Sequence, residues 1–292
     1  MSTMSTIAVT GSTGALGTIV IDELLDRVPA SQIVAIARSA AKAAPLRAKG
    51  VDVRIADYDQ PSTLAPALKG VDNLLLISAN EPGKRFPQHQ AVVDAAKTAG
   101  VSFLAYTSLL DAPTSTSPLA PEHVQTEAYI SASGIDHAFL RNGWYHENYL
   151  GTLDQARQSG VLLTSAGAGK VSSAARGDYA EAAAIVVSQA GHVGTAYELA
   201  GDAAWTQDDL AADFESIIGL PVEVSNVSAD EHRAALAAAG VPDGLKEFIV
   251  GVDKSIANGA LEDHSLDLSK LLGRPTSPLR AALSKSEVES VA

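Results

Sequence analysis

The sequence contains no cysteine, few basic residues and no long hydrophobic run, and each shortage excludes a class of protein. Without cysteine, the chain forms no disulfide, holds no Cys-ligated zinc ion or iron–sulfur cluster and uses no thiol nucleophile. The 21 Lys and Arg residues face 34 Asp and Glu residues, so the net charge is −13 and a nucleic-acid partner is disfavoured. The sequence also lacks both a run of about 18 apolar residues and the regions of a signal peptide. We therefore expect a cytoplasmic protein without a membrane-spanning segment.

The composition is that of a folded protein with a substantial core. Hydrophobic residues make up 46% of the 292 residues and charged residues 19%, which excludes wholesale disorder. The length corresponds to one large domain or to two of average size.

Short β-branched segments alternate with amphipathic helical segments through the first half of the chain. Several of the helical segments end in glycine, which accepts the positive φ found after a helix. Alternation at this spacing predicts a doubly wound, Rossmann-like α/β fold, in which helices cover both faces of a parallel sheet. The predicted strands are residues 7–10, 32–37, 51–55, 73–77, 102–107 and 135–140.

The pattern becomes mainly helical after about residue 145. Thr206 and Ser228 are each followed three residues later by an acid, which is typical of a helix N-cap. We therefore expect a domain of residues 1–145 and a mainly helical subdomain of residues 146–292, with a cleft between them and strands that can join the main sheet. The predicted elements here are helices 146–158, 178–189, 206–218, 229–239 and 243–258, and strands 161–164, 197–199 and 222–227.

A glycine-rich loop lies between the first strand and the first helix. Its spacing is G-x-x-G-x-x-G, which alone also fits a structural turn. Between a strand and a helix, however, such glycines let the backbone approach a pyrophosphate, and the helix N-terminus presents free N–H groups to it. We predict that the loop binds a dinucleotide through Gly11, Ser12, Thr13, Gly14, Ala15, Leu16 and Gly17.

A second glycine segment, residues 167–170, does not match the pattern of a phosphate-binding loop. Position 164 is Thr where a phosphate loop needs its first Gly, and Val171 follows Lys170 where a Ser or Thr is needed. We interpret this segment as a glycine hairpin with a surface lysine that could still line the cleft.

The residue at the end of the second strand predicts which dinucleotide binds. Enzymes that use NAD place Asp or Glu about 20 residues beyond the loop, where the carboxylate accepts from the ribose 2′-hydroxyl. Here Arg38 occupies that place, Lys42 lies one turn further on, and no carboxylate is present. A guanidinium suits a 2′-phosphate, so NADP (NADPH) is the predicted cofactor, against the alternative that Arg38 is merely solvated.

The catalytic pair of ordinary short-chain dehydrogenases is absent. Those enzymes carry Tyr-x-x-x-Lys on a helix after the fifth strand, with a Ser upstream. Ser108 does end the fifth strand, but His123 and Glu127 occupy the Tyr and Lys positions. None of the seven tyrosines has a Lys four residues on, so ketone reduction by that mechanism is disfavoured.

Seven segments of the chain resemble the NmrA-like atypical short-chain dehydrogenase/reductase family: TGSTGALG, VPASQIVAIAR, LLLIS, AYTSLL, EHVQTE, LRNGWYHENY and YELAGDAAWT. The resemblance covers residues 5 to about 280. Within that family the chain is most similar to bacterial NAD(P)H:quinone oxidoreductases of type 2, with triphenylmethane-dye reductases as near relatives.

This resemblance implies a quinone reductase that lacks the Tyr/Lys pair. It implies that Gly11, Gly14, Gly17 and Arg38 bind NADPH. A quinone is already electrophilic and its reduction product is a stabilised phenolate, so positioning beside the hydride suffices without a catalytic residue or a flavin.

Other predicted site residues follow the strand ends, because ligands bind at the carboxyl edge of such sheets. Trp144 and Tyr145 have rings that can stack on a flat substrate, with core packing as the alternative. Ser108, Trp144 and Tyr145 are the predicted substrate contacts, while His146 and Glu147 are proton sources or, equally, capping or surface groups. The further predicted cofactor contacts are Asp57, Tyr58, Ser78, Ala79, Asn80, Asn142, Gly143, Trp144, Tyr145, His146 and Glu147.

Alternatives stay open at three places. His123 and Glu127 share a helix face, where an exposed polar pair is expected more than an acid–base or metal pair, and no metal site is predicted. Residues 238–245 form a predicted hinge or closing element. In place of a quinone reductase, the missing Tyr/Lys pair also fits an NADP(H)-binding redox sensor or a reductase of another aromatic electrophile, such as a dye.

Overall fold

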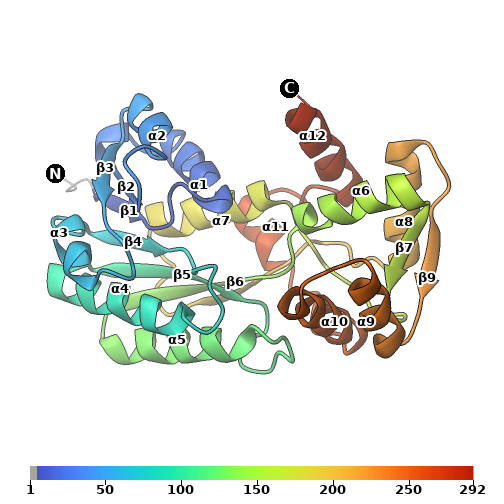
Figure 1. Cartoon of the computed structure of the whole chain (residues 1–292). Coiled ribbons are helices and arrows are strands. Elements are labelled where there is room, and N and C mark those ends of the chain that lie inside the picture. The colour runs from blue at the N-terminus through green and yellow to red at the C-terminus, as the bar shows by residue number, and fades with distance from the viewer. Residues whose placement is uncertain (1–4, 292) are drawn as a thin grey trace. The chain divides into compact units, whose positions relative to one another are not determined.

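The protein is described by a computed structural model that covers residues 5–291, with the backbone alone from residue 286 onward. A seven-stranded sheet has the order β3-β2-β1-β4-β5-β6-β8 (Figure 1). Every neighbouring pair from β3 to β6 is parallel, which confirms the predicted Rossmann-like sheet. The strands are β1 (Ile7–Val9), β2 (Ile33–Ala37), β3 (Asp52–Ile55), β4 (Asn73–Leu76), β5 (Phe103–Leu109), β6 (Asp136–Asn142) and β8 (Ala196–Leu199).

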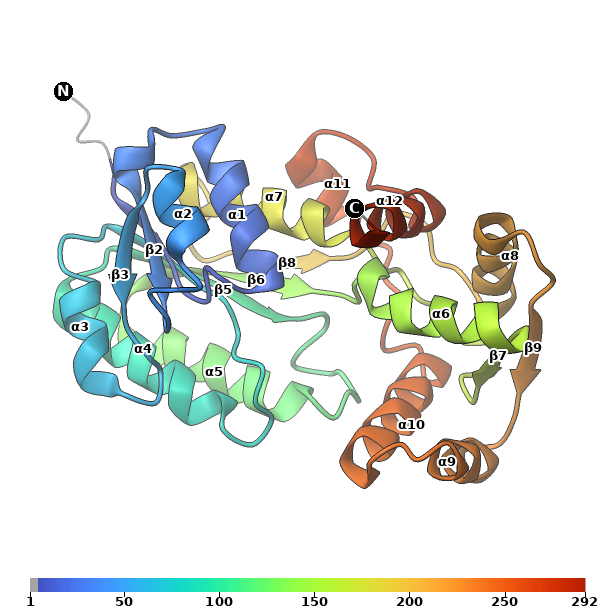
Figure 2. The ribbon, with the colours of Figure 1, turned by 45° about the horizontal axis from the view of Figure 1, so that its top comes forward.

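Helices cover both faces of this sheet, as Figures 1 and 2 show from two directions. One face carries α1 (Ala15–Leu25) and α7 (Arg176–Ser188), and the other carries α3 (Leu64–Ala67), α4 (Arg85–Ala99) and α5 (Ala120–Ser133). The short helix α2 (Ala44–Ala48) connects β2 to β3, and 3-10 turns precede β2 and α3 at Ala30–Gln32 and Pro61–Thr63.

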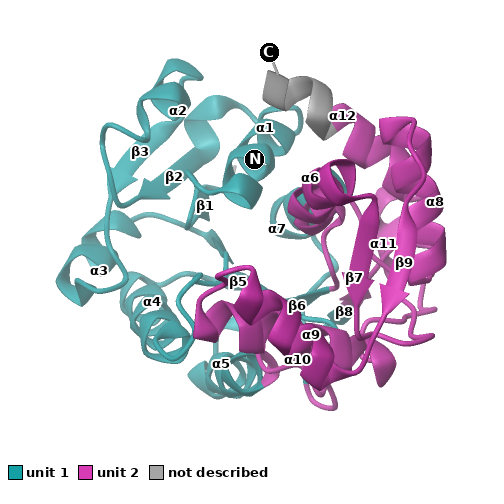
Figure 3. Cartoon of the chain, turned by 45° about the vertical axis from the view of Figure 1, so that its right-hand side comes forward, with its two compact units in different colours: residues 1–112, 121–142, 177–197 teal, residues 113–120, 143–176, 198–292 magenta. Residues whose placement is uncertain are grey.

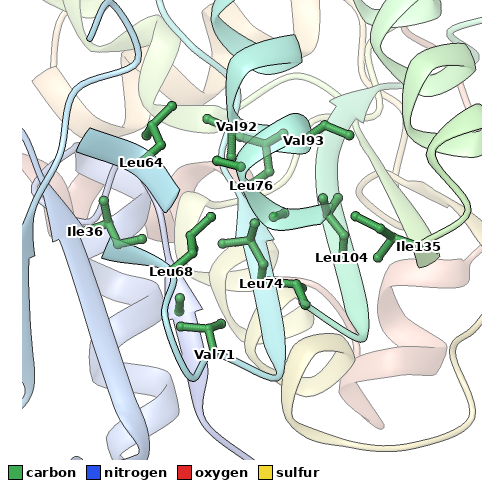
Figure 4. Packing of buried hydrophobic residues seen from close by; sticks show 14 of the residues in the cluster. Ile36, Leu64, Leu68, Val71, Leu74, Leu76, Val92, Val93, Leu104 and Ile135 are labelled. Carbon is green, nitrogen blue, oxygen red and sulfur yellow. The ribbon is translucent and has the colours of Figure 1, made fainter. Parts of the chain in front are cut away.

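The core on the α3–α5 face is built by alternate residues of each strand. Leu74 and Leu76 of β4 are fully buried there and lie among Leu68, which follows α3, and Val92 and Val93 of α4 (Figure 4). Successive side chains of a strand point to opposite faces, so this alternation leaves the intervening residues for the other face. Burial of each such side chain stabilises the fold by about 1.5–3 kcal/mol.

The chain divides into two compact units (Figure 3). The first unit comprises residues 1–112, 121–142 and 177–197, and the second comprises residues 113–120, 143–176 and 198–292. One boundary, at residues 142 and 143, lies close to the predicted boundary at 145. The chain then returns to the first unit with α7 and the start of β8, which adjoins β6 in the sheet.

The second unit combines a two-stranded parallel sheet with helices. Its sheet pairs β7 (Val161–Thr164) with β9 (Glu223–Asn226). The predicted helix 146–158 is a 3-10 turn followed by a helix, and the last two helices were not predicted. The helical elements are the 3-10 turn His146–Tyr149, α6 (Leu150–Ser159), α8 (Gln207–Ile218), α9 (Ala229–Ala238), α10 (Asp243–Ala257), α11 (Asp267–Leu272) and α12 (Leu279–Val291).

Of the local predictions for the second unit, the two helix N-caps are confirmed and the glycine hairpin is not. Thr206 and Ser228 are the N-caps of α8 and α9, and each forms a capping box with the acid three residues later. The 167–170 segment is a turn and not the predicted hairpin, because β7 before it pairs with β9 and Val171 after it pairs with Trp205. A Cβ on Gly169 would lie 2.3 Å from the carbonyl oxygen of Ile256, so this position requires glycine. Lys170 is half exposed at its surface.

Within the 238–245 stretch only residues 239–242 form the turn between α9 and α10, and Gly244 lies inside α10. Gly240 has a φ of +76°, which glycine adopts without strain. Arg233 of α9 donates to a carboxylate oxygen of Glu247 in α10 at 2.8 Å, which links the two helices. The role of the stretch as a closing element stays a prediction. Within residues 5–291, no helix is both long and apolar enough to cross a membrane.

Candidate cofactor site

The glycine loop joins β1 to α1 by a turn that other residues cannot make. Gly11 has a φ of +61°, and the amide of Gly14 donates to its carbonyl oxygen at 2.9 Å. A Cβ on Gly17 would lie 2.3 Å from that same oxygen, so α1 approaches the loop as closely as only glycine permits. Gly14 is the N-cap of α1 and offers no side chain to the first amides of the helix. Those N–H groups are therefore available to an anion.

Two hydroxyl side chains tie this loop to the neighbouring strands. The hydroxyl of Ser12 donates to the carbonyl oxygen of Ile36 at 2.8 Å, and the hydroxyl of Thr10 donates to the carbonyl oxygen of Leu75 at 3.2 Å. Ser12 is fully buried. The Ser12 side chain thus holds the loop against β2 and does not reach a cofactor. Any contact between this part of the loop and a cofactor comes from backbone atoms of the adjacent residues.

Arg38 follows β2 at the same edge of the sheet and is exposed. It makes no hydrogen bond or ion pair with another residue of the described part of the chain, and Lys42 is exposed nearby in the sequence. A free guanidinium with no carboxylate at this strand end fits a phosphate monoester and does not fit an unmodified ribose. These residues therefore match the donor set that NADPH needs.

The end of β3 is held to the end of β4 by Tyr58. Its hydroxyl donates to the carbonyl oxygen of Ile77 at 3.2 Å. Burial raises the pKa of Tyr58, while Thr10 and the Arg38 guanidinium act in the opposite direction. Asp57 closes the preceding turn, because its side chain accepts the amide of Asp59 at 3.2 Å.

The segment 78–80 after β4 is fixed through its backbone. The amide of Ser78 donates to the hydroxyl oxygen of Thr107 at 2.8 Å. Ala79 is bonded on both sides, since its amide donates to His89 Nε2 at 2.9 Å and its carbonyl accepts from Arg85 Nε at 2.8 Å. Asn80 is exposed beyond them.

Glu127, at the Lys position of the short-chain pair, forms an ion pair with Arg141 of β6. Glu127 accepts from Arg141 twice, at 3.0 Å from Nε and at 2.8 Å from Nη2. The hydroxyl of Ser108 donates to the same carboxylate at 2.6 Å. Glu127 is 7% exposed and His123 is 4% exposed. The expectation of an exposed polar pair was therefore wrong, because this face of α5 packs on the ends of β5 and β6.

His123 does not contact the partners of Glu127 and belongs to a separate cluster with Tyr106 and His89. Tyr106 lies between His123 and His89, with its hydroxyl 2.8 Å from Nδ1 of His123 and 3.4 Å from Nδ1 of His89. Burial lowers the pKa of both histidines to about 3, and Arg85 adds to the effect. Both rings are thus neutral at physiological pH. Among the side chains that the structure describes, no group of three or more His, Asp or Glu is arranged to hold a metal ion.

These neutral histidines make stability depend on pH. The unfolded chain binds a proton at each ring near the ordinary pKa of 6.5, whereas the folded chain binds it only near pH 3. Stability is therefore full above about pH 7 and falls as the pH decreases. At pH 5 we expect each histidine to reduce the free energy of unfolding by about 2 kcal/mol. Urea unfolding at pH 7 and pH 5 measures this.

The matched variant His123→Gln should lose about half of that pH-dependent decrease. An equal free energy of unfolding for the unaltered protein at both pH values would show that the two rings are not buried as neutral groups.

Residues 143–147 belong to the second unit. Both nitrogens of His146 are occupied, Nδ1 by Ser173 Oγ at 2.7 Å and Nε2 by the carbonyl of Ser277 at 3.0 Å. Glu147 caps α7 through the amide of Arg176, at 2.9 and 3.1 Å. Glu147 is thus a helix cap, whereas His146 is buried among residues of the second unit and is neither a cap nor a surface group.

The two aromatic residues of this segment are partly buried. Trp144 packs against the apolar core of the second unit, and the Arg176 guanidinium lies 5.5 Å from the ring centre of Tyr145. Asn142, at the end of β6, is buried in the first unit. The contacts of residues 142–147 with cofactor or substrate stay predictions.

Sequence reasoning missed Arg85 and His89, although a signal was present. The buried positions of α4 recur at helical spacing and continue from Val92 and Val93 back through Arg85, Gln88 and His89. Polar residues on an otherwise apolar stripe indicate a buried polar network, because such groups are buried only with partners.

The comparisons with known proteins agree with this geometry. The family that matches residues 11–190 is described as NAD(P)H-binding. The chain is 52% identical over 278 residues to Quinone oxidoreductase 2 of Escherichia coli (strain K12), covering 95% of this chain and 97% of that protein.

Two solved structures are similar along almost the whole chain. The NADPH-dependent quinone oxidoreductase QOR2 of Escherichia coli, complexed with NADPH, has a TM-score of 0.93 and 51% identity and covers 96% of this chain and 99% of that one. The triphenylmethane reductase of Citrobacter sp., complexed with NADP(H), has a TM-score of 0.91 and 40% identity, with the same coverage of 96% and 99%.

Proposed function

The chain belongs to the NAD(P)H-binding family, and we propose that it is an NADPH-dependent reductase that transfers hydride directly to quinones. The observation that carries this proposal is the 52% identity to Quinone oxidoreductase 2, which extends over nearly the full length of both proteins. The resemblance to type 2 quinone oxidoreductases and triphenylmethane-dye reductases is confirmed.

In this proposal the first unit binds NADPH through its backbone and Arg38. The open amides at the start of α1, from Ala15 to Gly17, hold the pyrophosphate, and Arg38 holds the 2′-phosphate with help from Lys42. Segment 78–80 borders the nicotinamide ribose. When bound, NADPH supplies the hydride.

In this proposal Ser108, near the end of β5, positions the substrate and does not donate a proton to it. The hydroxyl hydrogen of Ser108 is donated to Glu127, whose side chain also accepts two hydrogen bonds from Arg141. Hydride transfer to a quinone yields a hydroquinone monoanion, which takes its proton from water. An alkoxide formed from a ketone would need an acid at this place, so quinones fit the arrangement and simple ketones do not.

The test is turnover by the purified protein in the absence of flavin. NADPH oxidation should accelerate on addition of benzoquinone or naphthoquinone, and added flavin should change nothing. Turnover only with triphenylmethane or azo dyes would assign a different aromatic electrophile. Calorimetry with NADP⁺ and NADPH completes the test, because strong discrimination between them without turnover would favour a redox sensor.

A further inference from the structure

Two residues of α4 hold the backbone of one residue in the segment after β4. Arg85 and His89 are separated by four positions, so they lie on the same face of the helix, and both are buried, with exposures of 6% and 0%. Arg85 donates to the carbonyl of Ala79, and His89 accepts from its amide. Both backbone polar groups of Ala79 are thus bonded to side chains of one helix.

The tautomer of His89 follows from this contact. Because Nε2 accepts the amide of Ala79, the ring proton lies on Nδ1. Nδ1 is 3.0 Å from the hydroxyl oxygen of Thr126, whose own hydrogen is donated to the carbonyl of Glu122 at 2.7 Å. The ring is therefore held in one orientation, with its acceptor lone pair directed at the segment.

The other end of the clamp is also held. Arg85 Nη1 lies 3.8 Å from Oε2 of Glu122, and Glu122 in turn accepts the amides of Gly83 at 3.0 Å and Phe86 at 3.3 Å. The start of α4 is thereby bound to α5. The positions of Arg85 and His89 depend on this packing and not on a ligand.

We propose that Arg85 and His89 are positioning residues, which hold Ala79 so that segment 78–80 is preorganised for the nicotinamide ribose of NADPH. This inference rests on the proposed function for the contact between that segment and the cofactor. A segment that is ordered before binding loses less conformational entropy on binding, so its clamp strengthens affinity without touching the ligand.

Two substitutions of His89 separate the clamp from simple packing. The side-chain oxygen in His89→Gln can reach the place of Nε2 and accept the Ala79 amide, whereas that in His89→Asn is too short. We expect His89→Asn to weaken NADPH binding about tenfold and His89→Gln to stay within about twofold of the unaltered protein. Calorimetric titration with NADPH alone, without quinone, gives the dissociation constants.

His123→Asn is the matched control, since His123 is equally buried in the same cluster but contacts Tyr106 instead of the segment. It should lower thermal stability like His89→Asn and leave NADPH affinity within about twofold. Equal affinity loss in His89→Asn and His123→Asn, or unchanged affinity in both, would overturn the clamp. If His89→Asn does not fold, loss of affinity in Arg85→Met, which keeps an unbranched stem but carries no donor, supports the clamp, and unchanged affinity refutes it. A failure of quinone turnover with intact NADPH binding would instead count against the proposed function alone.

Discussion

Replacing Glu127 with alanine should destabilise the protein by about 3 kcal/mol, because it breaks a buried ion pair from one side only. Glu127 accepts two hydrogen bonds from Arg141 and one from Ser108. Without the carboxylate, a guanidinium whose side chain is 16% exposed loses its two hydrogen bonds to Glu127, and the Ser108 hydroxyl loses its acceptor. We place the effect at the lower end of the range for buried pairs because both side chains keep some exposure. Urea unfolding of the two proteins at pH 7 measures the difference.

The matched control removes both charges. Glu127→Leu combined with Arg141→Met replaces the pair with apolar groups of similar length, and it should recover much of the lost stability. A loss below about 1 kcal/mol for Glu127→Ala, which is the range of a surface pair, would contradict the buried arrangement.

Replacing Arg38 should change the choice between NADPH and NADH. A charge-assisted contact with a 2′-phosphate is worth about 1.5–3 kcal/mol, so Arg38→Ala should weaken NADPH binding roughly 10–150-fold. NADH has no phosphate at that place, and its affinity should change little. Because Arg38 makes no hydrogen bond or ion pair within the described part of the chain, its removal should also leave the melting temperature nearly unchanged.

Arg38→Asp should go further than Arg38→Ala. Its carboxylate repels the 2′-phosphate of NADPH and can accept from the 2′-hydroxyl of NADH, so the preference should shift toward NADH. Lys42 can share the phosphate, and the double variant Arg38→Ala/Lys42→Ala shows how much. If NADPH and NADH affinities fall together in all three variants, Arg38 has a structural role and does not select the cofactor.

Features that depend on neighbouring residues in the chain were predictable from the sequence. The loop from Gly11 to Gly17 and the strand before it form one local unit, in which Gly11 takes a positive φ and Gly17 lies too close to the Gly11 carbonyl oxygen for any side chain. The position of Arg38 was equally predictable, because Arg38 directly follows a buried strand and therefore lies at the carboxyl edge of the sheet. The caps at Thr206 and Ser228 are also local, and both were predicted.

Features that depend on pairing across the fold were not predictable. The helical spacing showed that His123 and Glu127 share a face of α5, but only packing decides whether that face is buried. The partner of Glu127 is Arg141, which comes from the next strand and carries no sequence signal that relates it to α5. The two units are likewise not separated by a single boundary in the sequence, because segment 177–197 returns to the first unit. No change in composition marks that return.

Hydride transfer from bound NADPH to a quinone without flavin is tested most directly by a single-turnover experiment. The protein is mixed under anaerobic conditions with one equivalent of NADPH and then with naphthoquinone, while the absorbance of reduced nicotinamide is followed and the hydroquinone is quantified. We predict one hydroquinone for each NADPH oxidised, at a rate far above the protein-free mixture and independent of added flavin. A rate equal to that of the protein-free mixture, or an acceleration that appears only with flavin, would contradict direct transfer.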